Sequence, residues 1–200
     1  MDRTRLIVTM TALAALPRAE TAQQGSGDRA SAPQIIPRKP MMDRYRWLGL
    51  AIGVALADQW AKHWIAGTFP LGAGETVLPF FNLVHILNSG AAFSFLANAG
   101  GWQRYVFIAL ALVVSVGLTV MLLKGVANRW EGWGYSLFLG GAVGNLVDRL
   151  GRGAVVDYLD FHAGGWHWPA FNLADTALCL SAFILLLGTL LSSAQSKAPT

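Results

Sequence analysis

Hydrophobic residues fall into four long runs that are separated by polar connections. Each run approaches the length of about 20 residues that a helix needs to cross the hydrocarbon core of a bilayer. Because that core holds no water to satisfy backbone polar groups, the runs are expected to be helical. The pattern predicts membrane spans at residues 47–65, 105–123, 133–150 and 172–191.

The connection at residues 67–101 is long for a simple link between two spans. Its segment 76–87 is rich in β-branched and aromatic residues, which favours short strands, and residues 155–159 add a second extended piece. The predicted fold is therefore mainly α. It is a polytopic membrane protein with four transmembrane helices and a small extracytoplasmic β-rich loop region.

The first forty residues differ in composition from the rest of the chain. Residues 6–16 form an apolar stretch of eleven, too short to span a bilayer, and the stretch up to residue 40 is polar and rich in proline. Met41 and Met42 then precede the first span, which suggests that translation begins there. We expect residues 1–40 to be a disordered extension or to lie upstream of the true start, 41–195 to form the membrane domain, and 196–200 to be a cytoplasmic tail.

Charged residues make up only 13% of the chain, about half the usual share in soluble domains, which indicates a lipid environment. Residues 66–103 and 153–170 contain no lysine or arginine. By the positive-inside rule these two loops lie outside and both termini are cytoplasmic. The basic residues are scattered or confined to the first forty positions, which excludes a nucleic-acid-binding surface. Tryptophans near the predicted span ends fit interfacial anchors: Trp47, Trp64, Trp102, Trp130, Trp133, Trp166 and Trp168.

In this topology the polar residues of the spans gather in the outer half of the membrane. Asp58 and Lys62 are four residues apart, as are Asn145 and Arg149, so each pair shares one helix face. Gly141 joins the stripe of Asn145, and residues 140–144 form a GxxxG motif typical of close helix packing. Because buried membrane charges are costly, such groups are expected to be paired or functional.

Two carboxyl groups that face each other can hydrolyse a peptide bond without a metal. One pKa rises because both cannot ionise cheaply, so the pair shares a proton and activates water. Asp157, Asp160 and Asp175 are the candidates near the outer surface, with Asp148 behind them. Spacing alone does not choose between them. Asp175 could also simply interact with the dipole at a helix start.

Other functional classes fit the pattern less well. A transporter or channel would distribute polar groups across the membrane depth, and a passive assembly subunit gives no reason for Asp157 and Asp175 to coincide. His162 and His167 lie five apart without an H-E-x-x-H helix, so a metal hydrolase is poorly supported. The single cysteine, Cys179, is interpreted as a small packing residue at lipid depth.

Five short motifs occur in one order along the chain. They are D-Q-x-x-K at 58–62, N-S-G-A-A-F-S at 88–94, G-N-L-V-D-R at 144–149, V-V-D-Y-L-D-F at 155–161 and F-N-L-A-D at 171–175. Together with the four-span layout, they resemble the lipoprotein signal peptidase (signal peptidase II) family. The resemblance covers residues 43–191, and Tyr158 stands where that family often has Phe or Met.

The resemblance implies a membrane aspartyl endopeptidase that cleaves bacterial prolipoproteins just before a diacylglyceryl-modified cysteine. It implies Asp157 and Asp175 as the catalytic pair, no metal or organic cofactor, and an outer active site in the cytoplasmic (inner) membrane. The expected partners are lipid-modified prolipoproteins and membrane lipid, with no nucleic acid, and the protein is expected to be monomeric. Residues 67–101 are expected to cover the cleft. The supporting residues that the resemblance implies are Asp58, Lys62, Asn88, Gly90, Gly141, Asn145, Asp148, Arg149, Asn172 and Ala174.

Overall fold

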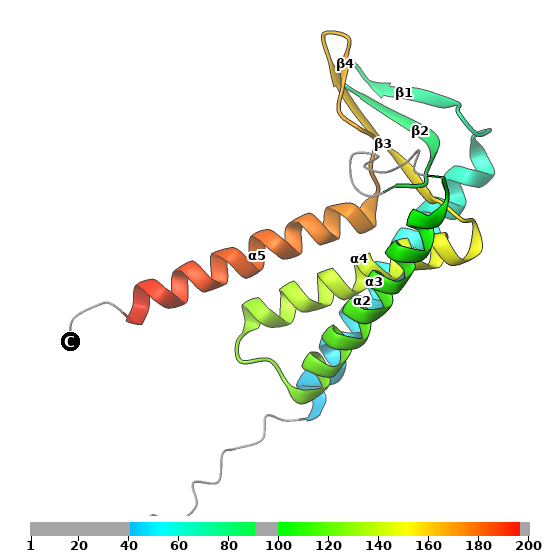
Figure 1. Cartoon of the computed structure of the whole chain (residues 1–200). Coiled ribbons are helices and arrows are strands. Elements are labelled where there is room, and N and C mark those ends of the chain that lie inside the picture. Colours follow the sequence, from blue (N-terminus) through cyan, green and yellow to red (C-terminus); the bar gives the residue numbers. More distant parts are fainter. Residues whose placement is uncertain (1–40, 91–99, 197–200) are drawn as a thin grey trace, which may run out of the picture. The chain divides into compact units, whose positions relative to one another are not determined.

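The computed structural model describes residues 41–90 and 100–196, and the described part is four helices and a small antiparallel sheet (Figure 1). The mainly helical class and the strands predicted in the connections are therefore confirmed. The predictions for residues 1–40, for 197–200 and for the stretch 91–99 of the expected cover lie outside the described residues. The helices are α2 (Met41–Thr68), α3 (Trp102–Lys124), α4 (Arg129–Gly151) and α5 (Leu173–Ser196).

Each helix corresponds to one of the predicted apolar runs. Helices α2, α3 and α4 extend beyond their runs at both ends, whereas α5 begins one residue inside its run and extends beyond it at the other end. Among the described residues, two helices are long and apolar enough to cross a membrane by length and composition, Trp102–Lys124 and Leu173–Ser193. The other two, α2 and α4, carry polar residues within their predicted spans. Those residues include Asp58, Lys62 and Asp148, which are fully buried between the helices.

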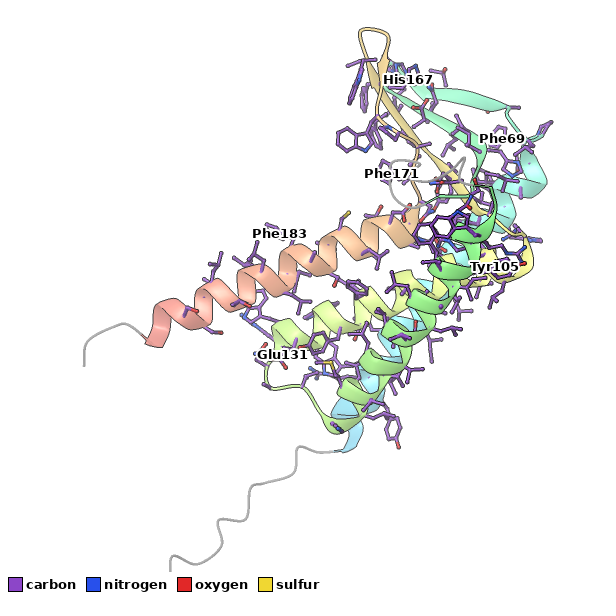
Figure 2. The ribbon with its side chains drawn as sticks, viewed as in Figure 1. Phe69, Tyr105, Glu131, His167, Phe171 and Phe183 are labelled. Atoms are coloured by element: carbon purple, nitrogen blue, oxygen red, sulfur yellow. The ribbon has the colours of Figure 1, made fainter. Side chains whose placement is uncertain are left out.

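The helices alternate in direction, so that α2 and α4 end, and α3 and α5 begin, beside the sheet (Figure 1). Glu131, near the start of α4, lies at the far end of the helices from His167 of the sheet (Figure 2). Asn128 caps α4 by accepting a hydrogen bond of 3.0 Å from the Glu131 backbone N–H. This cap fixes the start of α4 at the end of the helices away from the sheet (Figure 2).

Glycines on α4 allow its neighbours to approach closely. A Cβ at Gly140 would lie 2.7 Å from the Ala51 carbonyl oxygen of α2, and one at Gly141 would lie 2.5 Å from the Ala174 carbonyl oxygen of α5. The packing role predicted for the GxxxG motif is confirmed. Trp47 differs from its prediction as an interfacial anchor, because it is buried against Gly132, where the missing side chain leaves room for the indole.

The sheet has the order β1-β2-β3-β4, with strands β1 (Gly74–Leu78), β2 (Phe81–Asn88), β3 (Val155–Ala163) and β4 (Trp166–His167). Strands β2 and β3 come from different connections and pair antiparallel, with Asn88 opposite Val155 and Phe81 opposite Phe161. This long-range pairing brings the connection between α2 and α3 alongside the connection between α4 and α5. It places residues of both loops beside the start of α5.

Candidate active site

Asp157 lies on β3, and its side chain is held by two amides from other elements. Asn88 of β2 donates from Nδ2 to Oδ2 at 3.0 Å, and Asn172 donates from Nδ2 to Oδ1 at 2.7 Å. Asp157 is only 2% exposed. Each carboxyl oxygen therefore has a neutral donor, and within the described residues neither oxygen pairs with a cation.

Asp175 lies in the first turn of α5, where it forms a reciprocal cap with Asn172. The Asp175 backbone N–H donates to Asn172 Oδ1 at 2.9 Å, and the Asn172 backbone N–H donates to Asp175 Oδ2 at 3.3 Å. This is the pattern of a capping box, which satisfies N–H groups that a helix start leaves unpaired. The helix-start role considered for Asp175 is therefore real. Its other oxygen, Oδ1, accepts from Asn145 Nδ2 at 2.8 Å.

The remaining N–H groups of the first turn of α5 are also satisfied by distant parts of the chain. Leu173 N–H donates to the Tyr158 hydroxyl at 3.2 Å, and Ala174 N–H donates to Asp58 Oδ1 at 2.9 Å. The start of α5 is thus fastened to β3 and to α2. Because Asp175 follows directly, these bonds position its carboxylate.

Lys62 is the centre of a buried ionic cluster between α2 and α4. Its Nζ lies 2.8 Å from Asp58 Oδ2, 3.1 Å from Asp148 Oδ2 and 2.8 Å from Asn145 Oδ1, and all three charged side chains are fully buried. Asp148 also pairs with Arg152. Lys62 is therefore not a solvated charge. It neutralises two acids that are themselves fully buried.

The ionic cluster reaches the backbone beside both aspartates. Asp58 holds the N–H of Ala174, next to Asp175, and Asp148 Oδ2 accepts from the N–H of Val156, next to Asp157, at 3.1 Å. Lys62 also donates to Asn145 Oδ1, and Asn145 in turn donates to Asp175 Oδ1, which is a third connection. The cluster therefore determines where the two carboxylates stand without touching either of them.

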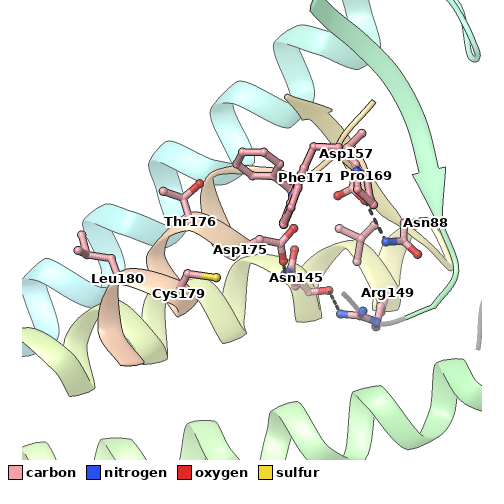
Figure 3. A pocket seen from close by; sticks show the side chains of 13 residues that line it. Asn88, Asn145, Arg149, Asp157, Pro169, Phe171, Asp175, Thr176, Cys179 and Leu180 are labelled. Carbon is pink, nitrogen blue, oxygen red and sulfur yellow. Dashed lines mark hydrogen bonds between the residues drawn. The ribbon is translucent and has the colours of Figure 1, made fainter. Parts of the chain in front are cut away.

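Asp157 and Asp175 line one cavity of about 440 Å³, Asp157 from β3 and Asp175 from α5 (Figure 3). The lining continues along α5 through Thr176, Cys179 and Leu180. The connection from β4 to α5 forms another wall. The remaining lining residues are Asn88, Asn145, Arg149, Val155, Trp168, Pro169, Ala170 and Phe171.

Burial and the neighbouring carboxylate of Asp175 raise the pKa of Asp157 from 3.8 to about 7. The hydrogen bonds from Asn88 and Asn172 and the charge of Lys62 oppose this rise. Asp157 can therefore hold a proton near neutral pH, as one member of a carboxyl pair must if the pair shares a proton.

Asp160 and Asp148, the other acids that spacing left open, do not line this cavity. Asp160 pairs with His167 and Asn82, and Asp148 belongs to the ionic cluster. Within residues 41–90 and 100–196, no group of three or more His, Cys, Asp and Glu side chains is arranged to hold a metal ion.

The structure brings the other expected residues to the same place. Arg149 donates from Nη2 to the Gly90 carbonyl oxygen at 2.9 Å, and Gly90 N–H donates to Asn88 Oδ1 at 2.9 Å. Arg149 thereby ties the end of β2 to α4. Gly141 allows α5 to approach, as described above.

Sequence reasoning missed several residues of the site, among them Gln59 and Cys179. Gln59 donates to the Gly144 carbonyl oxygen at 2.9 Å and to Asp148 Oδ1 at 3.2 Å, although only its motif had been noted. Cys179 lines the cavity instead of filling a helix contact. Its position four residues after Asp175 is the signal that could have placed it on the same face of α5.

Comparisons with known proteins agree with this geometry. The family model described as signal peptidase (SPase) II matches residues 50–191. A lipoprotein signal peptidase of Paraburkholderia phymatum is 49% identical over 140 residues, covering 70% of this chain and 84% of the relative. One of Yersinia enterocolitica is 44% identical over 154 residues, covering 76% and 91%.

Solved structures give the same result for the fold. A bacterial membrane enzyme determined by the in meso method at 2.3 Å resolution has a TM-score of 0.69 and 28% identity, over 78% of this chain and 94% of that one. A second, at 1.9 Å resolution, has a TM-score of 0.63 and 29% identity, over 73% and 93%. The chain therefore belongs to the signal peptidase II family, the bacterial membrane peptidases that remove signal peptides from prolipoproteins.

Proposed function

We propose that Asp157 and Asp175 are the catalytic pair of this peptidase. The observation that carries the proposal is that both carboxyl groups line one cavity, in which burial and the neighbouring Asp175 raise the pKa of Asp157 to about 7. Neither carboxyl forms an ion pair among the described residues. Both are held by amides, which orient a carboxyl group without fixing its charge. The residues proposed to support the pair are Asp58, Lys62, Asn88, Gly90, Gly141, Asn145, Asp148, Arg149, Asn172 and Ala174.

The pair would act as a general base and a general acid on one water molecule. The ionised carboxylate takes a proton from water, and the water oxygen forms a bond to the scissile carbonyl carbon. The protonated carboxyl gives its proton to the carbonyl oxygen. Collapse of the tetrahedral intermediate then breaks the C–N bond, and a carboxyl proton moves to the leaving amine. Because the two groups titrate as a unit, the two roles belong to the pair.

The substrate is a prolipoprotein cleaved just before its diacylglyceryl-modified cysteine. Such a substrate needs a site that water can reach at one end and acyl chains at the other. Amide and carboxyl groups gather at the dyad end of the cavity, whereas its continuation along α5 ends at the apolar Leu180. This continuation suits the acyl chains or the apolar part of the signal peptide.

All four helices are proposed to span the cytoplasmic membrane, with both termini in the cytoplasm and the sheet and dyad at the outer face. Helices α2 and α4 fall short of the simple apolar criterion because their charges are buried against each other. Residues 41–195 would form the peptidase domain, acting as a monomer surrounded by lipid, with residues 1–40 and 196–200 outside it.

The dyad is tested with purified protein and a lipid-modified prolipoprotein, comparing wild type with Asp157→Asn and Asp175→Asn. Each amide keeps the shape of the side chain but cannot share the proton. We expect each variant to lose at least about a hundredfold in kcat, with unchanged expression. Glu75→Gln is the matched control, because Glu75 is an exposed acid on the same sheet and does not line the cavity. Substantial turnover by either dyad variant would overturn the assignment.

The topology is tested with single cysteines in a Cys179→Ser background. A cysteine at Trp166 should react with a membrane-impermeant maleimide in intact spheroplasts. A cysteine at Glu131 should react only after the membrane is permeabilised. The reverse pattern, or equal labelling at both positions, would contradict the proposed orientation.

A further inference from the structure

A chain of side-chain hydrogen bonds crosses all four strands of the sheet, with one residue from each strand. Thr76 of β1 donates from Oγ1 to Asn82 Oδ1 at 2.9 Å, and Asn82 of β2 donates from Nδ2 to Asp160 Oδ2 at 2.7 Å. His167 of β4 lies with Nδ1 2.9 Å from Oδ1 and 3.0 Å from Oδ2 of Asp160. We call Thr76, Asn82, Asp160 and His167 the cross-strand chain.

Asn82 and His167 contact the Asp160 carboxyl group from the strands on either side of β3. Asp160 is only 8% exposed, and burial alone would favour its neutral form. The hydrogen bonds from Asn82 and His167, with the charges of His167 and His162, outweigh burial and lower the pKa of Asp160 below 3.8. Because an ionised carboxylate only accepts, Nδ1 of His167 carries the hydrogen.

The His167 side chain is fastened where the backbone pairing is weakest. Strand β4 has two residues and follows the turn of Gly164 and Gly165, both with positive φ. The His167 ring stacks on the His162 ring, with the ring centroids 4.9 Å apart. A two-residue strand is too short to hold its position by ladder bonds alone. The bond to Asp160 therefore adds to the backbone contacts that hold β4 in place.

The segment that follows His167 is a wall of the candidate active site. Residues 168–171 all line the cavity that contains Asp157 and Asp175. The wall is tied to β3 by the bond from Trp168 N–H to the Phe161 carbonyl oxygen at 2.8 Å, and by the pairing of Phe171 with Leu159. Asp160 lies between these two attachment points on β3. Neither Asp160 nor His167 lines the cavity itself.

We propose that Asp160 and His167 are positioning residues for substrate binding, which hold the wall at residues 168–171 against the cavity through the cross-strand chain. This inference rests on the proposed function, because it assumes that the cavity binds the prolipoprotein. Neither residue touches the reacting atoms. Loss of the bond should therefore weaken binding and leave the chemistry of the bound substrate unchanged.

The test compares His167→Leu with His167→Asn. Asparagine places its Nδ2 where imidazole places Nδ1, so it can still donate to Asp160, whereas leucine has similar bulk and no donor. We expect His167→Leu to raise KM about tenfold, with kcat within about twofold of wild type, and His167→Asn to restore most of the affinity. The double variant Asp160→Asn/His167→Leu should be no worse than the more damaging single variant.

Equal KM values for the two His167 variants, whether raised or unchanged, would overturn the proposal. So would a fall in kcat at constant KM. Thermal unfolding of each purified variant in detergent confirms that the compared proteins are folded. The dyad variants separate this inference from the function on which it rests. If Asp157→Asn abolishes turnover and His167→Leu binds normally, only the role of the cross-strand chain fails.

Discussion

Asn172 donates a hydrogen bond of 2.7 Å from Nδ2 to Oδ1 of Asp157, although fifteen residues separate them in the chain. The same asparagine accepts from the backbone N–H of Asp175 with its Oδ1. It is fully buried, so water cannot replace either contact. One side chain therefore orients one carboxyl directly and sets the helix start that carries the other.

Replacing Asn172 with alanine should lower kcat about 10–100-fold, because Asp157 loses a buried donor and α5 loses its cap. The matched control is Asn128→Ala, which removes the cap of α4 at the opposite end of the helices. That control should cost about 1 kcal/mol of stability and leave kcat unchanged. Steady-state kinetics and thermal unfolding distinguish the two effects. Equal loss of kcat in both variants would show that capping alone is at work.

The raised pKa of Asp157 predicts how stability and activity depend on pH. The folded protein holds a proton on Asp157 up to about pH 7, whereas the unfolded chain releases it near 3.8. The folded state therefore binds more protons between these values, so the free energy of unfolding falls as pH rises through this window, by up to about 4 kcal/mol. Activity should also decline above about pH 7, where the pair loses its shared proton.

The variant Asp157→Asn checks the sign of this effect. Its amide imitates the protonated carboxyl at every pH, so the stability of the variant relative to the wild type should increase from pH 5 to pH 8. Thermal unfolding at the two pH values measures the difference. A relative stability that falls from pH 5 to pH 8 would show that the Asp157 carboxylate is favoured in the folded protein.

Replacing Lys62 with methionine should destabilise the protein by about 3–5 kcal/mol, because Asp58 and Asp148 would be left as buried acids without their common cation. Adding Asp58→Asn and Asp148→Asn to this variant should recover part of the loss. Lys124→Met is the control, since Lys124 is exposed at the other end of the helices. Denaturation midpoints in detergent give the comparison. Equal midpoints for the two lysine variants would mean that the cluster does not depend on its lysine.

Replacing Gly141 with alanine should reduce both stability and turnover. The added Cβ would meet the Ala174 carbonyl oxygen at 2.5 Å, so α5 must move away from α4, and Asp175 moves with it. The expected cost is about 1–3 kcal/mol. Gly117→Ala on α3 is the matched control, because no atom lies within 4 Å of its added Cβ. Its free energy of unfolding should rise by up to about 1 kcal/mol. Full activity in Gly141→Ala would show that the positions of Asp157 and Asp175 do not depend on the close contact between α4 and α5.

The amino-acid sequence by itself determined the elements and the family. Long apolar runs predict membrane-spanning helices, and residues 76–87 and 155–159 predict strands, because length, periodicity and composition can be recognised from neighbouring positions along the chain. The order of the five motifs identified the signal peptidase II resemblance. The shared face of Asp58 and Lys62 also followed from helix spacing alone.

The family resemblance named Asp157 and Asp175, but only the tertiary structure gives the physical reason why these two acids line one cavity. Asp148, Asp157, Asp160 and Asp175 are equivalent by spacing, but the pairing of β2 with β3 and the packing of α4 against α5 bring Asp157 and Asp175 to one cavity. The same packing directs Asp148 to Lys62 and Asp160 to His167. Local periodicity specifies which residues share a face of one element. Contacts between elements depend on how whole faces fit together, and that information is spread over the entire chain.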